Sequence, residues 1–313
     1  MVWSLANVAA GLLLLAVAAE VLVHGAASLS RRFGLSPLVI GLTVVSIGTS
    51  LPELVVSVEA AVTGNGGLAL GNVVGSNIAN IALILGIAAL IAPIAVQAKV
   101  VRTDAPILVA VSAGFIGLVW DGGLSRGDGV LLTVGILAYV FYTFHLAQQA
   151  SPDLQEEASS VLPSPHSVLL DGGLVAIGIA GLVGGAHFLV TGAITVAAAL
   201  GVSPVVIGLS VVAVGTSLPE LATSVVAAWR GQGDIAVGNA LGSSIFNLLG
   251  ILGVTVLIHP LSTASLGWTE LGVMVGLAVV VVPFLRSAYT LSRMEGSALL
   301  LSYLGYLAYL LMG

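Results

Sequence analysis

The 313-residue sequence has no cysteine and few charged residues, and these absences exclude several classes of protein. Charged side chains make up 7% of the chain, whereas a soluble globular domain carries about 25%. The chain cannot cover a soluble surface, which excludes a soluble enzyme and a disordered protein. Its eight Lys and Arg residues are too few for a nucleic-acid-binding patch. Without cysteine there are no disulfides and no thiolate metal sites.

Motifs for nucleotides and cofactors are also missing. The only lysine, Lys99, follows Ala98, so the chain has no Gly-Lys-Ser/Thr phosphate loop. The histidines show no spacing that suggests a structural metal. We therefore expect no nucleotide and no cofactor, and we expect any active transport by this chain to use an ion gradient.

Apolar residues, in contrast, make up 58% of the chain, and the mean hydropathy is +1.17. A helix that crosses a bilayer needs about 20 apolar residues. The length of the apolar stretches favours helices over the short alternating strands of a membrane barrel. The predicted fold class is an all-α polytopic membrane protein with ten transmembrane helices, over residues 2–24, 36–63, 68–93, 103–120, 129–148, 168–190, 203–229, 235–258, 268–285 and 295–312.

The placement of basic residues predicts how the chain is oriented in the cell membrane. If the N-terminus and the C-terminus are outside, only Arg126 falls in the outside connections. The other basic residues fall inside, as the positive-inside rule requires, and a wrong span count would scramble this bias. The inside residues are Arg31, Arg32, Lys99, Arg102, Arg230, Arg286 and Arg293.

The chain contains two copies of one unit. Residues 34–93 align with 201–260 at a constant offset of 167, and more than half of the aligned positions are identical. Both copies contain GTSLPEL, and GNVVGSNIAN aligns with GNALGSSIFN. Because five spans is an odd number, the second copy would enter the membrane from the opposite side, as in many secondary transporters. We predict a first five-helix repeat at 1–147, a cytoplasmic linker at 148–167 and an inverted second repeat at 168–313.

Glu53 and Glu220, which align at that offset, lie well inside apolar spans. An ionised carboxylate inside the bilayer costs roughly 3 kcal/mol or more unless it is paired. No Lys or Arg lies deep in a predicted span, so the partner must be a mobile cation or a proton. A permanently protonated, hydrogen-bonded glutamate is the structural alternative, which its recurrence in both copies disfavours.

Small polar residues accompany the glutamates in both copies. Proline precedes each glutamate and frees a carbonyl one turn earlier, within 46–48 and 213–215. Together with hydroxyls and a carboxylate, such carbonyls form an all-oxygen ligand set, which suits hard cations such as calcium and sodium. The alternatives are a kink used only for packing and polar pairs used only to join helices. In the next span Ser and Asn lie four apart on one helix face, as Ser76 with Asn80 and Ser243 with Asn247.

Two other acidic residues lie in the predicted spans. Glu20 aligns with His187, so the copies differ there, and we expect a structural role at a polar interior or interface. Glu59 lies beyond Glu53 towards the outer mouth, where we expect a solvated or interfacial carboxylate.

The doubled motifs resemble the calcium/cation antiporter superfamily, specifically the prokaryotic sodium/calcium exchangers. The resemblance covers nearly the whole chain and implies a four-site ion cluster among the second, third, seventh and eighth helices. Glu53 and Glu220 would bridge the calcium and sodium sites, while the first and sixth helices slide to alternate access. The other ion ligands that the resemblance implies are main-chain oxygens of Thr49 and Thr216, Ser50, Ser217, Ser76 and Ser243, and the carbonyls of Ser46 and Ala213, with Asn80 and Asn247 at the two remaining central positions.

Several relatives in that family carry Asp where this chain has Asn247. With Asn at both 80 and 247, the cluster has two formal negative charges. One calcium ion would neutralise them, and three sodium ions would leave a charge of +1. The chain therefore resembles potassium-independent members more than potassium-dependent ones.

We expect a secondary active antiporter, and not an enzyme, that exchanges sodium for calcium and functions as a monomer in the lipid bilayer. Calcium/proton exchange through the same glutamates is the alternative, because carboxylates also bind protons. A passive channel would need no inverted duplication. The sequence Gly-Gln-Gly-Asp at 231–234 resembles an element of intramembrane aspartyl proteases, but Asp234 lies at a span edge without a second intramembrane Asp.

Overall fold

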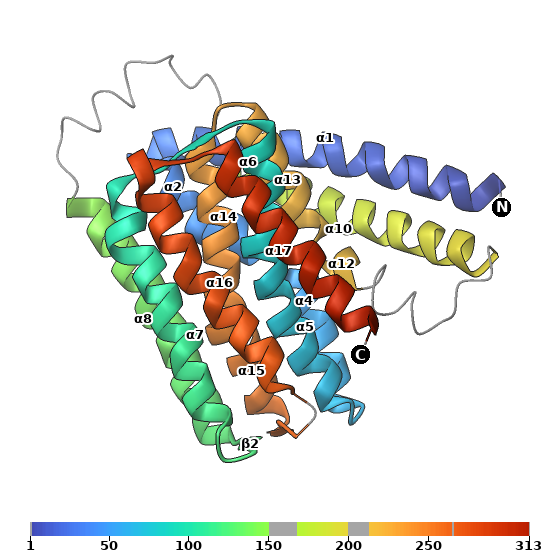
Figure 1. Ribbon diagram of the computed structural model, residues 1–313. Helices are drawn as coiled ribbons and strands as arrows, with labels where there is room; N and C mark the ends of the chain where they lie inside the picture. Colours follow the sequence, from blue (N-terminus) through green and yellow to red (C-terminus); the bar gives the residue numbers. More distant parts are fainter. Residues whose placement is uncertain (1, 150–167, 200–212, 265, 313) are drawn as a thin grey trace.

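The computed structural model describes residues 2–149, 168–199, 213–264 and 266–312, which form a bundle of helices (Figure 1). The first half contains α1 (Val2–Phe33), α2 (Pro37–Ile40), the π-helical η1 (Gly41–Val45), α3 (Ser46–Thr49), α4 (Leu51–Val62), α5 (Gly66–Ile78), the π-helical η2 (Ala79–Ile84), α6 (Leu85–Ile91), the π-helical η3 (Val100–Asp104), α7 (Ala105–Val119) and α8 (Arg126–Gln149). The second half contains α10 (Val168–Ala199), α12 (Ala213–Thr216), α13 (Leu218–Trp229), α14 (Gly233–Phe246), the π-helical η5 (Asn247–Ile251), α15 (Leu252–Ile258), α16 (Trp268–Arg286), the 3-10 helix η6 (Ser287–Tyr289) and α17 (Arg293–Met312).

Seven helices of the described chain are long and apolar enough to cross a membrane, and a bent pair, Pro37–Thr49 with Leu51–Val62, makes an eighth. The fold is therefore that of a multi-pass helical membrane protein. Of the two other predicted spans, 203–229 lies partly in 200–212, outside the described residues. The span predicted at 295–312 lies in the 20-residue helix α17, which is not among the eight. The count of ten spans stays a prediction.

Two spans occupy the centre of the bundle. In its most apolar stretch Gly66–Ile91 is 72% buried and Gly233–Ile258 is 78% buried, whereas the other unbroken spans are at most 39% buried. Glycine allows this central packing. At Gly242 of α14, a Cβ atom would lie 2.7 Å from the carbonyl oxygen of Leu42 in η1, so only glycine permits this approach of the two backbones.

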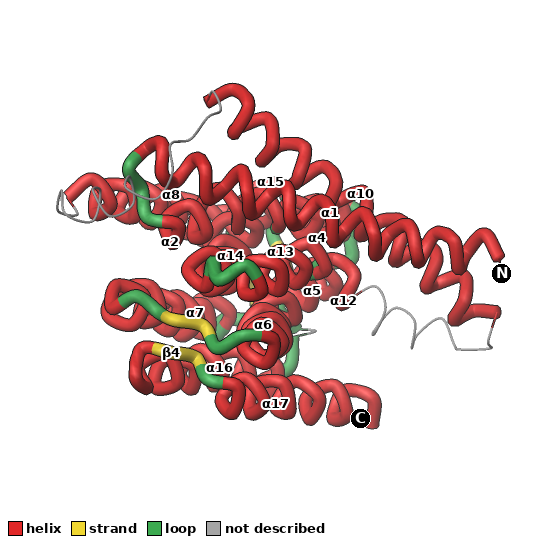
Figure 2. The backbone as a smooth tube through the Cα atoms, turned by 90° about the horizontal axis from the view of Figure 1, so that it is seen from above, coloured by secondary structure: helices red, strands yellow, loops and turns green. Residues whose placement is uncertain are grey.

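Short strands join the two halves at both ends of the bundle. β1 (Ile94–Ala95) pairs antiparallel with β4 (Thr290–Leu291), and β2 (Gly123–Leu124) pairs antiparallel with β3 (Leu261–Ser262). The offset of 167 relates β1 to β3 and β2 to β4, so the two pairings are equivalent. They lie at opposite ends of the bundle, with β2 at the bottom of Figure 1 and β4 facing the viewer in Figure 2. We name these the β1–β4 end and the β2–β3 end.

The equivalent helices α1 and α10 lie side by side and run in opposite directions (Figure 1). Each has 32 residues, or about 48 Å of helix, which exceeds a hydrocarbon core of about 30 Å and requires tilt. Equivalent glycines make equivalent contacts, Gly11 with Leu189 and Gly178 with Leu22. A Cβ atom at these glycines would approach the facing helix to 2.5 Å and 2.7 Å. The pair therefore packs backbone against backbone.

The predicted linker at 148–167 lies almost wholly outside the described residues, since α8 ends at Gln149 and α10 begins at Val168. The boundaries of the two repeats stay predictions, as does the placement of both termini outside the cell.

Candidate ion-binding site

Each of the two predicted glutamates follows a break in its helix. The break falls at Ser50, between α3 and α4, and at Ser217, between α12 and α13. Their backbone angles are nearly identical, with φ −86° and ψ 9° at the first and φ −87° and ψ 7° at the second. Pro52 and Pro219 lie in the first turn of the new helices, where a missing N–H breaks no hydrogen bond within the new helix. This explains how proline is accommodated inside the membrane.

The breaks place helix ends beside the glutamates. α3 ends at Thr49 and α12 ends at Thr216, whereas Glu53 and Glu220 lie in the first turns of α4 and α13. The N-terminal end of a helix carries a partial positive charge, and the C-terminal end a partial negative charge. The positive end favours an ionised carboxylate, and the carbonyls of the negative end favour a cation next to it. The predicted main-chain ligands at both threonines therefore lie where such carbonyls are found.

Each glutamate is hydrogen-bonded to the serine at the break of the other copy. Ser50 Oγ donates to Glu220 Oε1 at 2.7 Å, and Ser217 Oγ donates to Glu53 Oε1 at 3.3 Å. Both glutamates are buried, with 1% of their surface exposed. Because each carboxylate needs a hydroxyl from the other copy, the two copies build one shared site.

Neither glutamate has a basic partner among the residues that the structure describes. The two ion pairs of the described residues involve Arg32 and Arg230, and both are made with other carboxylates. The second carboxylate oxygens, Glu53 Oε2 and Glu220 Oε2, are buried and have no hydrogen-bond partner in the described parts of the chain. A buried carboxylate that has no counter-charge, and one oxygen without a donor, is unstable as an anion. These two oxygens are therefore available to a cation or a proton.

Predicted serine ligands extend the site. The hydroxyl of Ser76 lies 3.3 Å from Ser217 Oγ, and Ser243 Oγ donates to the carbonyl of Ser46 at 3.4 Å. The Ser46 carbonyl also accepts the Ser50 backbone N–H at 3.1 Å, so the break does not free it from the helix. Pro52 has no N–H to donate to the carbonyl four residues before it, which is that of Gly48. The other predicted carbonyl ligand belongs to Ala213, which is the first residue of α12.

Asn80 and Asn247 lie where regular helices change to π-helical segments. Asn80 is the second residue of η2, and Asn247 is the first residue of η5. Such segments are frequent at functional sites. Both residues are 1% exposed, and within the described ranges Asn80 Oδ1 and Asn247 Oδ1 have no hydrogen-bond partner. Buried polar atoms are rarely left unsatisfied, so these two amide oxygens are further candidate ligands.

A second pair of asparagines supports the glutamates, and our sequence analysis did not single it out. Asn72 Nδ2 donates to the Glu53 carbonyl at 3.2 Å and to Ser57 Oγ at 2.9 Å. Asn239 Nδ2 donates to the Glu220 carbonyl at 3.2 Å and to Ser224 Oγ at 3.0 Å, which is the same arrangement. Each asparagine therefore fixes the helix turn that carries its glutamate.

These asparagines also connect the two copies. Thr49 Oγ1 donates to Asn239 Oδ1 at 3.1 Å, and Thr216 Oγ1 donates to Asn72 Oδ1 at 3.4 Å. The sequence carried a signal for them, because each follows the first glycine of the repeated GNxxGS motif. Repetition in both copies marked them as strongly as it marked the serines, but an asparagine next to a helix-packing glycine resembles ordinary interhelical contact.

Oxygen is the dominant ligand atom of this site. Carboxylate, hydroxyl, amide and main-chain oxygens suit hard cations such as calcium, which takes six to eight oxygen ligands. No three His, Asp or Glu side chains come together in the described parts of the chain, so the site has two acidic groups and no more. A site of this kind can hold a divalent cation or a set of monovalent cations with little excess charge.

Comparisons with known proteins agree with this chemistry. A family model described as sodium/calcium exchanger protein matches residues 3–147 and 171–312. The sodium/calcium exchanger MaX1 of Methanosarcina acetivorans is 33% identical to this chain, with 96% of each chain covered. The inner membrane protein YrbG of Escherichia coli is 39% identical, with 80% of this chain and 78% of YrbG covered. A solved structure of the sodium-calcium exchanger NCX_Mj, soaked with Na⁺ and Sr²⁺, matches with a TM-score of 0.85 at 32% identity over 98% of each chain.

Proposed function

The chain belongs to the sodium/calcium exchanger protein family, and we propose that it exchanges sodium for calcium at the site centred on Glu53 and Glu220. Family membership makes it a cation/calcium antiporter of the membrane, which is a transporter. One observation supports the finer proposal. Two buried glutamates, each held by a serine of the other copy, retain an oxygen that accepts no hydrogen bond from the described residues.

The ligand set supports sodium as the counter-ion. Ser76 and Ser217 are hydroxyl ligands for a small monovalent cation near Glu53, and Ser50 and Ser243 lie near Glu220. Protons alone would require the carboxylates and not a surrounding shell of neutral oxygens. The main-chain oxygens of Thr49 and Thr216, at the helix ends, would complete the shell around calcium.

The two carboxylates also limit the charge that the site can hold. One Ca²⁺ or two Na⁺ would neutralise Glu53 and Glu220, because Asn80 and Asn247 contribute no charge. A third Na⁺ would leave the site at +1, which is costly in a low-dielectric interior. Competition for two negative charges explains why calcium and sodium would exclude each other, and mutual exclusion is what couples their opposite movements.

We assign the moving parts to α1 and α10. Both helices pack against the broken helices, α1 against η1 and α13, and α10 against α3, α12 and α13. Sliding of this pair would cover the site from one membrane face and expose it to the other. Inverted orientation of the two copies would make the two conformations similar, because each copy would adopt in one state the shape of its partner in the other.

The site needs no second polypeptide. Both glutamates and both serines at the breaks come from one chain, so a monomer would suffice for exchange. In the orientation that the positive-inside rule predicts, both termini lie outside, and the β1–β4 end, near Arg230, faces the cytoplasm.

Transport by purified protein in lipid vesicles tests the proposal. Vesicles loaded with sodium and diluted into sodium-free buffer should accumulate labelled calcium, and equal sodium on both sides should stop this uptake. Vesicles loaded with potassium in place of sodium are the matched control. Equal uptake into both kinds of vesicle would overturn sodium coupling.

Calcium/proton exchange is the second candidate. Glu53 Oε2 and Glu220 Oε2 have no partner, so each carboxylate has room for a proton as well as for a metal ion. Uptake of calcium that follows an imposed pH gradient in sodium-free vesicles would favour this alternative. Uptake that follows only the sodium gradient would exclude it.

A further inference from the structure

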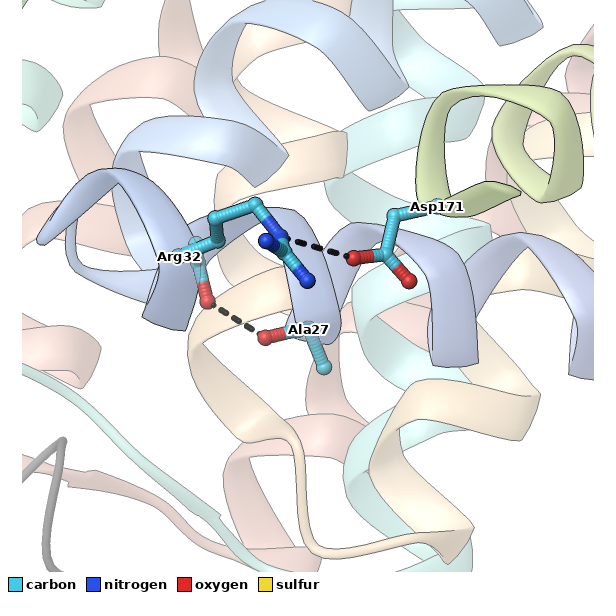
Figure 3. A network of polar contacts seen from close by, with 4 residues as sticks. Ala27, Arg32 and Asp171 are labelled. Atoms are coloured by element: carbon cyan, nitrogen blue, oxygen red, sulfur yellow. Dashed lines mark hydrogen bonds and ion pairs between the residues drawn. The ribbon is translucent and has the colours of Figure 1, made fainter. Parts of the chain in front are cut away.

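The ion pairs of the described residues lie on one side of the site. Arg230, at the C-terminal cap of α13, pairs with Glu20 of α1, with Arg230 Nε 2.9 Å from Glu20 Oε2. Arg32 of α1 pairs with Asp171 of α10 at 3.2 Å, as Figure 3 shows. α13 ends at Trp229, close to the start of α14, where Gly233 lies against β1. The Glu20–Arg230 pair therefore joins α1 to α13 at the β1–β4 end.

The opposite end lacks the equivalent ion pair. At the offset of 167, Glu20 aligns with His187 and Arg230 aligns with Thr63. A threonine carries no charge, so these two side chains cannot form an ion pair when α10 approaches α4. The two ends of an otherwise duplicated molecule thus differ in how strongly a long helix can be held.

The packing of the long helices is asymmetric in the same sense. α1 packs along α13, whereas α10 makes no comparable contact with α4 among the described residues. Leu51 and Val55 of α4 are 41% and 62% exposed, while their counterparts Leu218 and Ala222 are half-buried. Since α13 runs from the site to the β1–β4 end, the long helices cover that end more closely than they cover α4.

The ion pair also borders a cavity of about 170 Å³. The cavity is lined by residues of α1, including Glu20, His24, Ala27 and Arg31, and by Arg230 and Gln232 of the turn that follows α13. Ala27 is 7% exposed, and it faces this cavity between α1 and the turn that follows α13. Separation of these helices would expose Ala27 to water, which makes this position a reporter of opening at the β1–β4 end.

We propose that the Glu20–Arg230 ion pair holds the β1–β4 end closed and so makes the two membrane faces unequal in apparent ion affinity. This role rests on the proposed function, because it requires alternating access by α1 and α10. An interaction formed in only one of two conformations shifts their ratio by its own free energy. A half-exposed ion pair of this kind shifts such a ratio by about two- to fivefold.

Cysteine labelling tests this role without background, since the natural chain has no cysteine. Ala27→Cys protein in lipid nanodiscs would be treated with a water-soluble maleimide, in the absence of any ion gradient. We expect Glu20→Gln in this background to raise the labelling rate about two- to fivefold. The charge exchange Glu20→Arg with Arg230→Glu should return the rate to that of the parent. An unchanged rate in Glu20→Gln would overturn the proposal, and so would failure of the exchanged pair to restore it.

Transfer of the ion pair to the other end gives an independent test. His187→Glu with Thr63→Arg should favour closure at the β2–β3 end and therefore raise the labelling of Ala27→Cys about two- to fivefold. Thr63→Arg alone is the matched control and should leave the rate unchanged. A double variant that labels like this control would contradict the role of the ion pair. The labelling readout does not depend on which ion is exchanged, so failure here differs from failure of sodium-driven calcium uptake.

Discussion

The two copies of the repeated unit differ little at the site and much at its edges. Ser50 bonds to Glu220, and its counterpart Ser217 bonds to Glu53, each reaching into the other copy. At the periphery, by contrast, the acidic residue that joins α1 to α13 aligns with a histidine. Under the proposed function, residues that hold the ions would serve both conformations, which would preserve their symmetry. Residues at the two ends meet different compartments, and there the copies have diverged.

Among the changes that test this comparison, removal of a glutamate charge should have the largest effect on transport. Glu53→Gln and Glu220→Gln should each reduce sodium-driven calcium uptake by about 100-fold or more, because breaking a buried charge interaction costs roughly 3 to 5 kcal/mol. Equal losses would show that the two copies contribute equally. Glu59→Gln, an exposed carboxylate on the same helix as Glu53, is the control and should transport normally. Full transport in either site variant would mean that its carboxylate is not a ligand.

Loss of the cross-copy hydroxyls should have the next largest effect. Ser50→Ala and Ser217→Ala should each weaken the apparent affinity for sodium about tenfold or more, since hydrogen bonds to charged groups contribute about 1.5 to 3 kcal/mol. The shorter bond predicts the larger loss for Ser50→Ala. Sodium titration of transport would measure both. Ser112→Ala is the control, since this buried serine of α7 has no hydrogen-bond partner among the described residues. It should leave the apparent sodium affinity unchanged.

A methyl group between α1 and α10 tests whether both copies contribute to sliding. Gly178→Ala and Gly11→Ala should each slow transport about tenfold while calcium binding at equilibrium stays unchanged, because overpacking costs about 1 to 3 kcal/mol. Gly184→Ala is the matched control, since its Cβ atom would lie 3.7 Å from Leu14. Stopped-flow transport and calorimetric binding separate the two effects. Weakened binding with normal turnover would place these glycines in site formation and not in sliding.

The supporting asparagines should show the smallest effects. Asn72→Ala and Asn239→Ala should each lower calcium affinity about fivefold, because each removes neutral hydrogen bonds worth about 1 kcal/mol. Calorimetric titration with calcium would measure the change. Asn77→Ala changes an asparagine of α5 whose amide contacts only the sulfur of Met274, and it should bind calcium normally. Unequal losses at positions 72 and 239 would reveal a difference between the copies that the hydrogen bonds do not show.

The family and the helical membrane fold were predictable from the sequence, and both predictions are confirmed. Duplication made this possible, because a proline, a glutamate and a serine repeated in register inside apolar spans stand out against a background of interchangeable residues. The number of spans, their inverted arrangement and the individual ion ligands stay predictions. Part of the seventh predicted span lies outside the described residues, so it adds nothing to the count.

Other features could not be predicted because they arise from contacts between distant segments. The spacing of the motifs gave no sign that Ser50 donates to the glutamate of the other copy. It also gave no sign that Glu20 and Arg230, which are far apart in sequence, meet in an ion pair. A repeat alignment compares equivalent positions, whereas these contacts join positions that are not equivalent. They follow from the way in which the two copies pack.

The paired strands at the two ends of the bundle have an implication for the origin of the chain. Ile94 pairs with Leu291, and Leu124 pairs with Leu261, so each half contributes equivalent strands to the two pairings. An ancestor of half the present length could have formed both pairings as a dimer of identical subunits inserted in opposite directions. Fusion of two such genes would have preserved every contact between subunits and freed each half to change on its own.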